Sequence, residues 1–124
     1  MEEHLVQLLA NTQLSAAGPR QQAELDLNQA KQNPEFPLAL ARIGAHTTIP
    51  TEIRQSALST LRKFVENNWS PDDYDEQRFP IADATKEQLR SMMLELVLNT
   101  EVERKVKTAA RYVLRLSMPH TAGS

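Results

Sequence analysis

The sequence predicts an all-α fold in which antiparallel helix pairs stack side by side. Seven prolines divide a chain that is rich in Leu, Ala, Gln, Glu, Lys and Arg, all of which favour helices. Between the prolines, apolar residues recur at the three- and four-residue spacing of amphipathic helices. No segment alternates apolar and polar residues with the period of a half-buried strand. We therefore expect helices with short links and no β-sheet.

Six helical segments are expected between the prolines. Proline suits the first turn of a helix or the link before it, so it marks where segments begin. Pro50 is expected to open the longest segment, with Thr48 or a neighbour as its cap. Thr85, followed three residues later by Gln88, has the spacing of a capping box and predicts the start of the fifth segment. The expected ranges are about 2–12, 19–32, 34–46, 50–69, 85–98 and 101–116.

A short internal repeat occurs in the second helix of each expected pair. A basic residue is followed by an alanine after three positions and by a leucine four positions later. The alanine would allow a neighbouring helix to approach, the leucine would fill the groove, and the basic residue would lie on a more exposed rim. The three occurrences are Arg20–Ala23–Leu27, Arg54–Ala57–Leu61 and Lys107–Ala110–Leu114.

This recurrence predicts an α-solenoid of about three HEAT-like or armadillo-like antiparallel helix pairs. The expected repeats cover about 1–33, 34–70 and 84–117, within one domain over 1–118, and residues 119–124 are expected to form a flexible tail. An open last repeat would leave apolar residues of its two helices uncovered, which could allow dimerisation.

Composition argues against several classes of function. The chain has 14 basic and 16 acidic residues and no cysteine. The resulting charge of −2 gives no reason to expect general nucleic-acid affinity. The lack of cysteine removes disulfides, zinc–thiolate sites and thiol nucleophiles, and the three histidines lack metal-ligand spacing. With no apolar run of about 20 residues and no cluster of nucleophile and base, we expect an intracellular binding protein without membrane span, catalytic residues, metal or cofactor.

Charge is distributed unevenly along the chain. The link after Trp69 has four carboxylates against one cation, whereas residues 101–116 have five cations against two carboxylates. Glu101–Lys105 and Glu103–Lys107 are expected to form favourable pairs four positions apart on the last helix. This asymmetry can steer charged partners, and it can equally be ordinary surface charge. The acidic link contains Asp72, Asp73, Asp75, Glu76 and Arg78.

Two stretches resemble the N-terminal domain of the importin beta superfamily. They are residues 34–43, PEFPLALARI, and residues 53–71, IRQSALSTLRKFVENNWSP. Shorter matches around Ala23–Leu27 and around Thr85–Leu94 extend the resemblance to about residues 1–116. The extended link after Trp69 is most similar to the importin-nine type of receptor.

The resemblance implies the N-terminal segment of a nuclear import receptor that shuttles between cytoplasm and nucleus. In such receptors the first repeats help to dock the small GTPase Ran in its GTP form, and the second helices line the concave side where Ran lies. Import cargo proteins and nucleoporins are further implied partners, whereas nucleic acid and membrane are not. Leu61-Arg62-Lys63 matches the family's Leu-Lys-Asn; Arg62 keeps the charge and Lys63 departs from the usual amide. The candidate Ran-binding residues are Arg62, Lys63, Glu66, Lys105 and Arg111.

Other residues are assigned structural roles, and two alternative functions remain. Arg54 is expected to brace the repeats by bonding a carbonyl or carboxylate, although it could also touch a partner. Trp69 is expected to pack against the neighbouring repeat, with Ala57 and Leu61 in the core. The candidate surface could also be a plain solvated face of a generic HEAT scaffold that ignores Ran. A closed helical bundle with a polar pocket would instead indicate a small enzyme or regulator.

Overall fold

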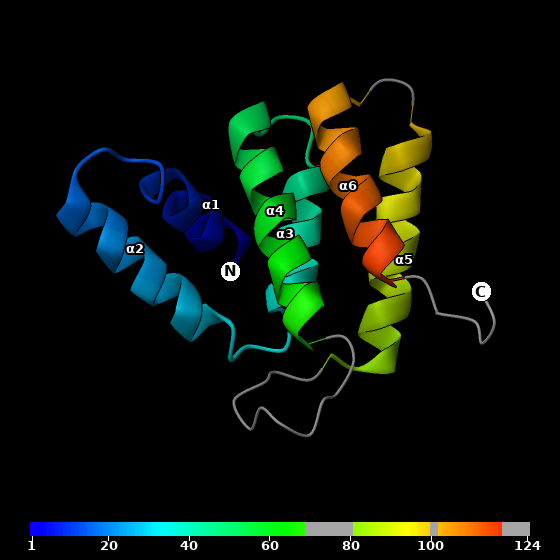
Figure 1. The fold of residues 1–124 in the computed structure, drawn as a ribbon, viewed down its shortest axis with the longest axis horizontal. Helices are drawn as coiled ribbons and strands as arrows, with labels where there is room; N and C mark the ends of the chain where they lie inside the picture. The colour runs from blue at the N-terminus through cyan, green and yellow to red at the C-terminus, as the bar shows by residue number, and fades with distance from the viewer. Residues whose placement is uncertain (69–80, 100–101, 118–124) are drawn as a thin grey trace.

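The computed structural model describes residues 1–68, 81–99 and 102–117 and is helical throughout, with no strand in these ranges. This confirms the predicted all-α class (Figure 1). The six helices are α1 (Glu2–Asn11), α2 (Ala17–Ala30), α3 (Phe36–Ala45), α4 (Thr51–Asn68), α5 (Asp83–Leu98) and α6 (Arg104–Ser117).

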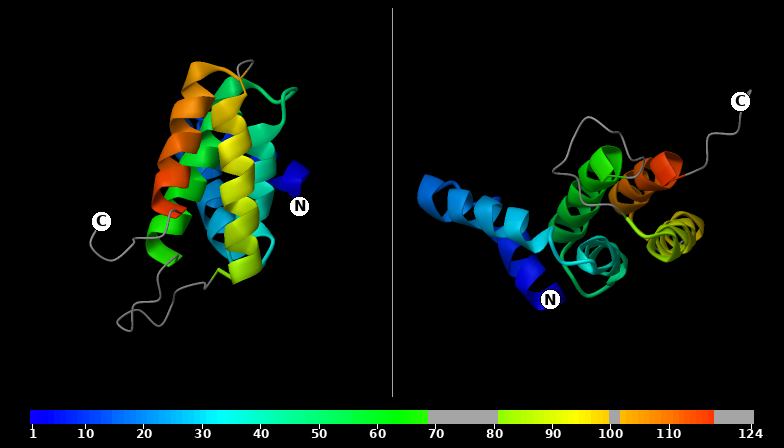
Figure 2. Two further views of the ribbon diagram at one scale, coloured as in Figure 1. Left: turned by 90° about the vertical axis from the view of Figure 1, so that its right-hand side faces the viewer. Right: turned by 90° about the horizontal axis from the view of Figure 1, so that it is seen from below.

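The helices pair in chain order and stack as an open row. Extensive contacts join α1 to α2, α3 to α4 and α5 to α6. Between pairs, α3 packs against α5 and α4 against α6, so α3 and α5 form one layer and α4 and α6 the other (Figure 2). The described helices therefore do not close into a bundle around a polar pocket, and the arrangement is that of a HEAT-like solenoid fragment.

The first pair is inclined to the other two (Figure 1). Helix α1 packs against both α3 and α4, whereas the extensive contacts of α2 are with α1. Helix α2 accordingly buries only Ala23 and Leu27, and Leu25 is 58% exposed. The continuous surface of second helices is therefore formed by α4 and α6, and α2 diverges from it.

The open last pair leaves apolar side chains uncovered, as expected. Leu94 and Leu98 of α5 are both exposed. Whether this leads to dimerisation remains a prediction.

Four expected helix starts differ from the structure by two or three residues: the expected starts are about 19, 34, 85 and 101, and the helices begin at Ala17, Phe36, Asp83 and Arg104. Helix α5 begins at Asp83, and Ala82 in the N-cap position makes no side-chain capping bond, so Thr85 lies inside the first turn and is not a cap. The buried Ile81 fixes the chain just before this helix, which explains why the helix starts earlier than the polar pattern indicated. Thr48 contacts the His46 ring at 2.8 Å within the preceding turn and does not cap α4.

One core runs through all three pairs. It includes the aromatic contact of Phe36 with Phe64, whose ring centroids lie 5.2 Å apart. The largest fully buried side chains are Phe36, Leu5, Leu9, Leu40, Ile43, Leu58, Leu61, Leu89, Met93, Val65, Val106 and Val113.

The repeated alanines mark close helix contacts. Ala23, Ala57 and Ala110 are all buried. The expectation that the basic residue of each repeat lies on an exposed rim is wrong for Arg54, which is only 4% exposed. Its guanidinium turns inward because a backbone carbonyl of the neighbouring helix accepts its hydrogen bond.

That carbonyl belongs to Gly44, where α3 and α4 lie in close contact. A Cβ placed on Gly44 would lie 2.5 Å from Leu58 Cδ2 and 2.6 Å from Leu58 Cγ, far inside van der Waals contact. Arg54 Nε donates to the Gly44 carbonyl oxygen at 3.0 Å in the interior. Glycine at this position lets the two helices touch, and the arginine satisfies a carbonyl near the end of α3.

Gly44→Ala should therefore destabilise the chain. Overpacking against Leu58 costs about 1–3 kcal/mol, which exceeds the gain of up to about 1 kcal/mol from replacing a helical glycine. Urea unfolding followed by circular dichroism measures the difference. Gly18→Ala is the matched control, because nothing lies within 4 Å of a Cβ there and the change should be neutral or stabilising. Equal stabilities for the Gly44→Ala variant and the parent would contradict the close-packing interpretation.

Candidate protein-docking surface

The candidate surface is the outer side of the layer formed by α4 and α6. Three of the predicted residues, Arg62, Lys63 and Glu66, lie in the C-terminal half of α4. Arg62 Nε lies 3.6 Å from Glu66 Oε1, and the two side chains are 38% and 46% exposed. They form an ion pair one helical turn apart, and Lys63 is exposed beside them.

Arg62 also contacts α6. The carbon at the centre of its guanidinium lies 5.3 Å from the ring centroid of Tyr112, the geometry of a cation–π interaction. Tyr112 is 48% exposed. Arg62 is therefore held from two sides, by a carboxylate on its own helix and by an aromatic ring on the next second helix.

Tyr112 was missed in the sequence analysis. Its signal was available, because it is the one aromatic residue in a helix whose other exposed positions are mostly basic. This signal did not suffice to identify the residue, because the helical pattern of α6 alone does not determine that Tyr112 faces α4.

The structure does not bring all five candidates together. Lys105 and Arg111 are both exposed on α6. They are six positions apart and so point about 120° away from each other around the helix axis. Arg111 instead shares a stripe at three- and four-residue spacing with Arg104, Lys107 and Arg115.

The expected ion pairs on the last helix are not seen in the described residues. Glu101 lies outside them. Glu103 accepts a hydrogen bond from Thr51 Oγ1 at 2.6 Å, and no ion pair with Lys107 is present in the described ranges. The carboxylate thus links the N-terminal ends of α4 and α6.

The residues assigned structural roles lie in the interior where they are described. Ala57 and Leu61 are fully buried. Arg54 makes the hydrogen bond to Gly44 described above, and its Nη2 atom is buried with no partner among the described residues. Its lack of exposure leaves no surface for a partner to contact. Trp69 lies outside the described residues.

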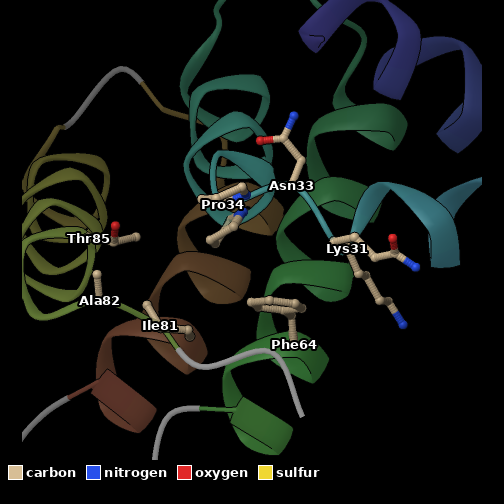
Figure 3. Close-up of a pocket in the computed structure, with 9 residues that line it drawn as sticks. Lys31, Asn33, Pro34, Phe64, Ile81, Ala82 and Thr85 are labelled. Carbon is tan, nitrogen blue, oxygen red and sulfur yellow. The ribbon is translucent and has the colours of Figure 1, made fainter. Parts of the chain in front are cut away.

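A cavity of about 190 Å³ lies at one end of the stack, where the α2–α3 link, α4 and the start of α5 meet (Figure 3). Pro34, Phe64 and Ile81 supply its apolar lining. Lys31 is the one charged side chain among the described lining residues. The described lining can accommodate an apolar group, and it contains no acidic side chain that could act together with a base.

Two further findings concern the described ranges alone. No cluster of three or more His, Asp or Glu side chains is arranged to hold a metal ion. No helix there has the length and apolar character needed to cross a bilayer.

An open stack of antiparallel helix pairs with a polar surface across its second helices is the architecture of an α-solenoid. Residues 23–99 match the sequence model of the importin-beta N-terminal domain. The chain belongs to this family, which forms the N-terminal region of nuclear transport receptors. No curated protein sequence matches the chain significantly.

The contact between Arg62 and Tyr112 should be measurable as a coupling between α4 and α6. We expect Arg62→Gln and Tyr112→Leu each to destabilise modestly, and a double-mutant cycle to give a coupling of about 0.5–1 kcal/mol, as for exposed cation–π pairs. Urea unfolding of the four proteins measures it. A cycle between Lys63→Gln and Tyr112→Leu is the control, with no expected coupling. Additive effects in the Arg62 cycle would show that the contact contributes nothing.

Proposed function

We propose that the chain is part of a nuclear import receptor and contributes to its docking site for Ran in the GTP form. The observation that carries the proposal is the family match over residues 23–99. It is supported by the exposed polar surface shared by α4 and α6, the layer of second helices. The importin-nine type of receptor remains the favoured branch, on the extended link after Trp69. The function is binding, without catalysis.

Within this surface, Arg62 and Lys63 have different roles. Arg62 is weakly restrained by Glu66 and Tyr112, so its charge is partly positioned before a partner binds. Lys63 is exposed and adapts to the partner. Lys105 and Arg111 flank α6 on different sides, and they belong to one footprint only if the partner covers most of the exposed side of that helix.

Ran binding would release cargo by a coupling between two linked sites. In the whole receptor, an import cargo protein and Ran would bind overlapping sites, or linked sites that favour different states of the solenoid. The receptor would then load cargo in the cytoplasm and release it in the nucleus. Nucleoporins would be contacted during passage through the pore.

The test is binding to Ran loaded with a non-hydrolysable GTP analogue and, in parallel, with GDP. The expected result is nucleotide-dependent binding that Lys63→Glu weakens by about fivefold or more, since reversal removes an attraction and adds a repulsion. Arg42→Glu is the matched control, because it makes the same charge change at an exposed position on α3, in the opposite layer.

Two results would count against the proposal. Equal binding of both nucleotide forms, or none, in the chain and in the full receptor would exclude a Ran site. Equal weakening by Lys63→Glu and Arg42→Glu would show that only overall charge matters. Capture of another protein regardless of the nucleotide on Ran would favour the generic HEAT scaffold.

A further inference from the structure

The cavity at one end of the stack lies where parts of all three helix pairs meet. Lys31 and Pro34 border it from the end of α2 and from the α2–α3 link, Phe64 borders it from α4, and Ile81 and Thr85 border it from the start of α5. Figure 3 shows Pro34 and Phe64 on different sides of it, with Thr85 on the α5 side. A molecule bound there would therefore touch segments that are distant in the sequence.

The interior of this cavity is apolar and has room for one aromatic ring. Phe64 is 5% exposed and Ile81 is 8% exposed, so close packing holds both in place and neither is free to fill the space. The volume of about 190 Å³ exceeds the volume of roughly 150 Å³ in which an engineered apolar cavity binds benzene. The ring side chains of Phe64, Pro34 and Pro37 supply most of the apolar surface that a flat ligand would contact.

A single cation stands beside this apolar space. Lys31 occupies the C-cap position of α2 and is half-buried. Its ammonium group is directed away from Pro34, so that the charge lies at the rim and not in the interior (Figure 3). Lys31 has no ion-pair partner within the described ranges, and no acidic side chain is among the described lining residues. An anionic group at the rim would thus meet a positive charge that no described carboxylate offsets.

We propose that this cavity binds a small aromatic carboxylate. The ring lies between Pro34 and Phe64, and the carboxylate emerges at the rim and pairs with Lys31. A ring is favoured over a flexible chain, because a rigid group loses little conformational freedom on binding. A carboxylate is favoured because one compact ammonium balances one negative charge. The proposal does not rest on Ran docking, since none of the five candidate Ran-binding residues lines the cavity.

The test is a titration of the isotope-labelled whole chain with phenylacetate, followed by NMR spectra of its backbone amides. We expect shifts concentrated at the α2–α3 link, around Phe64 and at the start of α5, with a dissociation constant of about a millimolar for so small a ligand. Phenylacetamide has the same shape without the charge and should bind about two- to fivefold more weakly. Acetate, which lacks the ring, and phenethylamine, which reverses the charge, should cause no such shifts.

Two variants test the two parts of the site separately. Lys31→Gln should weaken phenylacetate binding by about two- to fivefold and leave phenylacetamide binding unchanged, so that the two ligands bind alike. Lys107→Gln is the matched control, because it removes the same charge from another half-buried lysine, on α6 and outside the cavity, and should preserve the difference between the ligands. Ala82→Leu adds bulk to the cavity lining from an exposed position and should weaken both ligands by about tenfold.

The proposal is overturned if phenylacetate shifts no amides at the cavity up to about ten millimolar, or if phenylacetamide binds the parent chain as tightly. It is also overturned if Lys31→Gln weakens phenylacetate binding no more than Lys107→Gln does, or if Ala82→Leu leaves both affinities unchanged. Thermal melts verify that each variant retains its fold, and the ligand series on the parent chain needs no variant. Ran takes no part in the experiment, so failure of this proposal and failure of the Ran proposal are distinguishable.

Discussion

The close contact of α3 with α4 at Gly44 is the constraint on which the rest of the structure depends. Leu58 of α4 occupies the space that a side chain on Gly44 would need. Arg54, which also lies on α4, donates a hydrogen bond to the Gly44 carbonyl oxygen. Eight of the residues of α3 are buried, because α1, α4 and α5 all pack against it. A helix enclosed in this way can change its separation from α4 only by disturbing the neighbouring pairs as well.

The central pair therefore fixes both surfaces of the molecule. Helix α4 determines the position of Arg62, and the packing of α6 on α4 places the Tyr112 ring against the Arg62 guanidinium. In the opposite layer, the packing of α5 on α3 places Leu38 and Met92 on one hollow between these helices. The first pair contributes less to either surface, since α2 has its extensive contacts with α1.

The elements could be predicted from sequence because helical periodicity records which side of each helix is buried. The apolar stripes identified the six helices and most of the core, and the repeated alanines identified close contacts. Contacts between residues distant in sequence were not predictable in the same way. The partner of Arg54 is a carbonyl ten residues away, and Tyr112 meets Arg62 across two helices, so neither follows from local spacing. The start of α5 failed for a related reason, because the buried Ile81 outweighed the capping pattern at Thr85.

The way Arg62 is held has a consequence for any partner of the α4–α6 surface. Ordering a long side chain on binding costs about 0.5–1.5 kcal/mol, and Glu66 and Tyr112 have already restricted Arg62 in the free protein. The restraint is weak, because exposed ion pairs contribute at most about 1 kcal/mol, so a partner carboxylate could replace Glu66 at little cost. Arg62 thus offers a cation that is positioned before binding yet exchangeable during it. Lys63, with no such contact among the described residues, would contribute through longer-range attraction, and its effect should be the more sensitive of the two to salt.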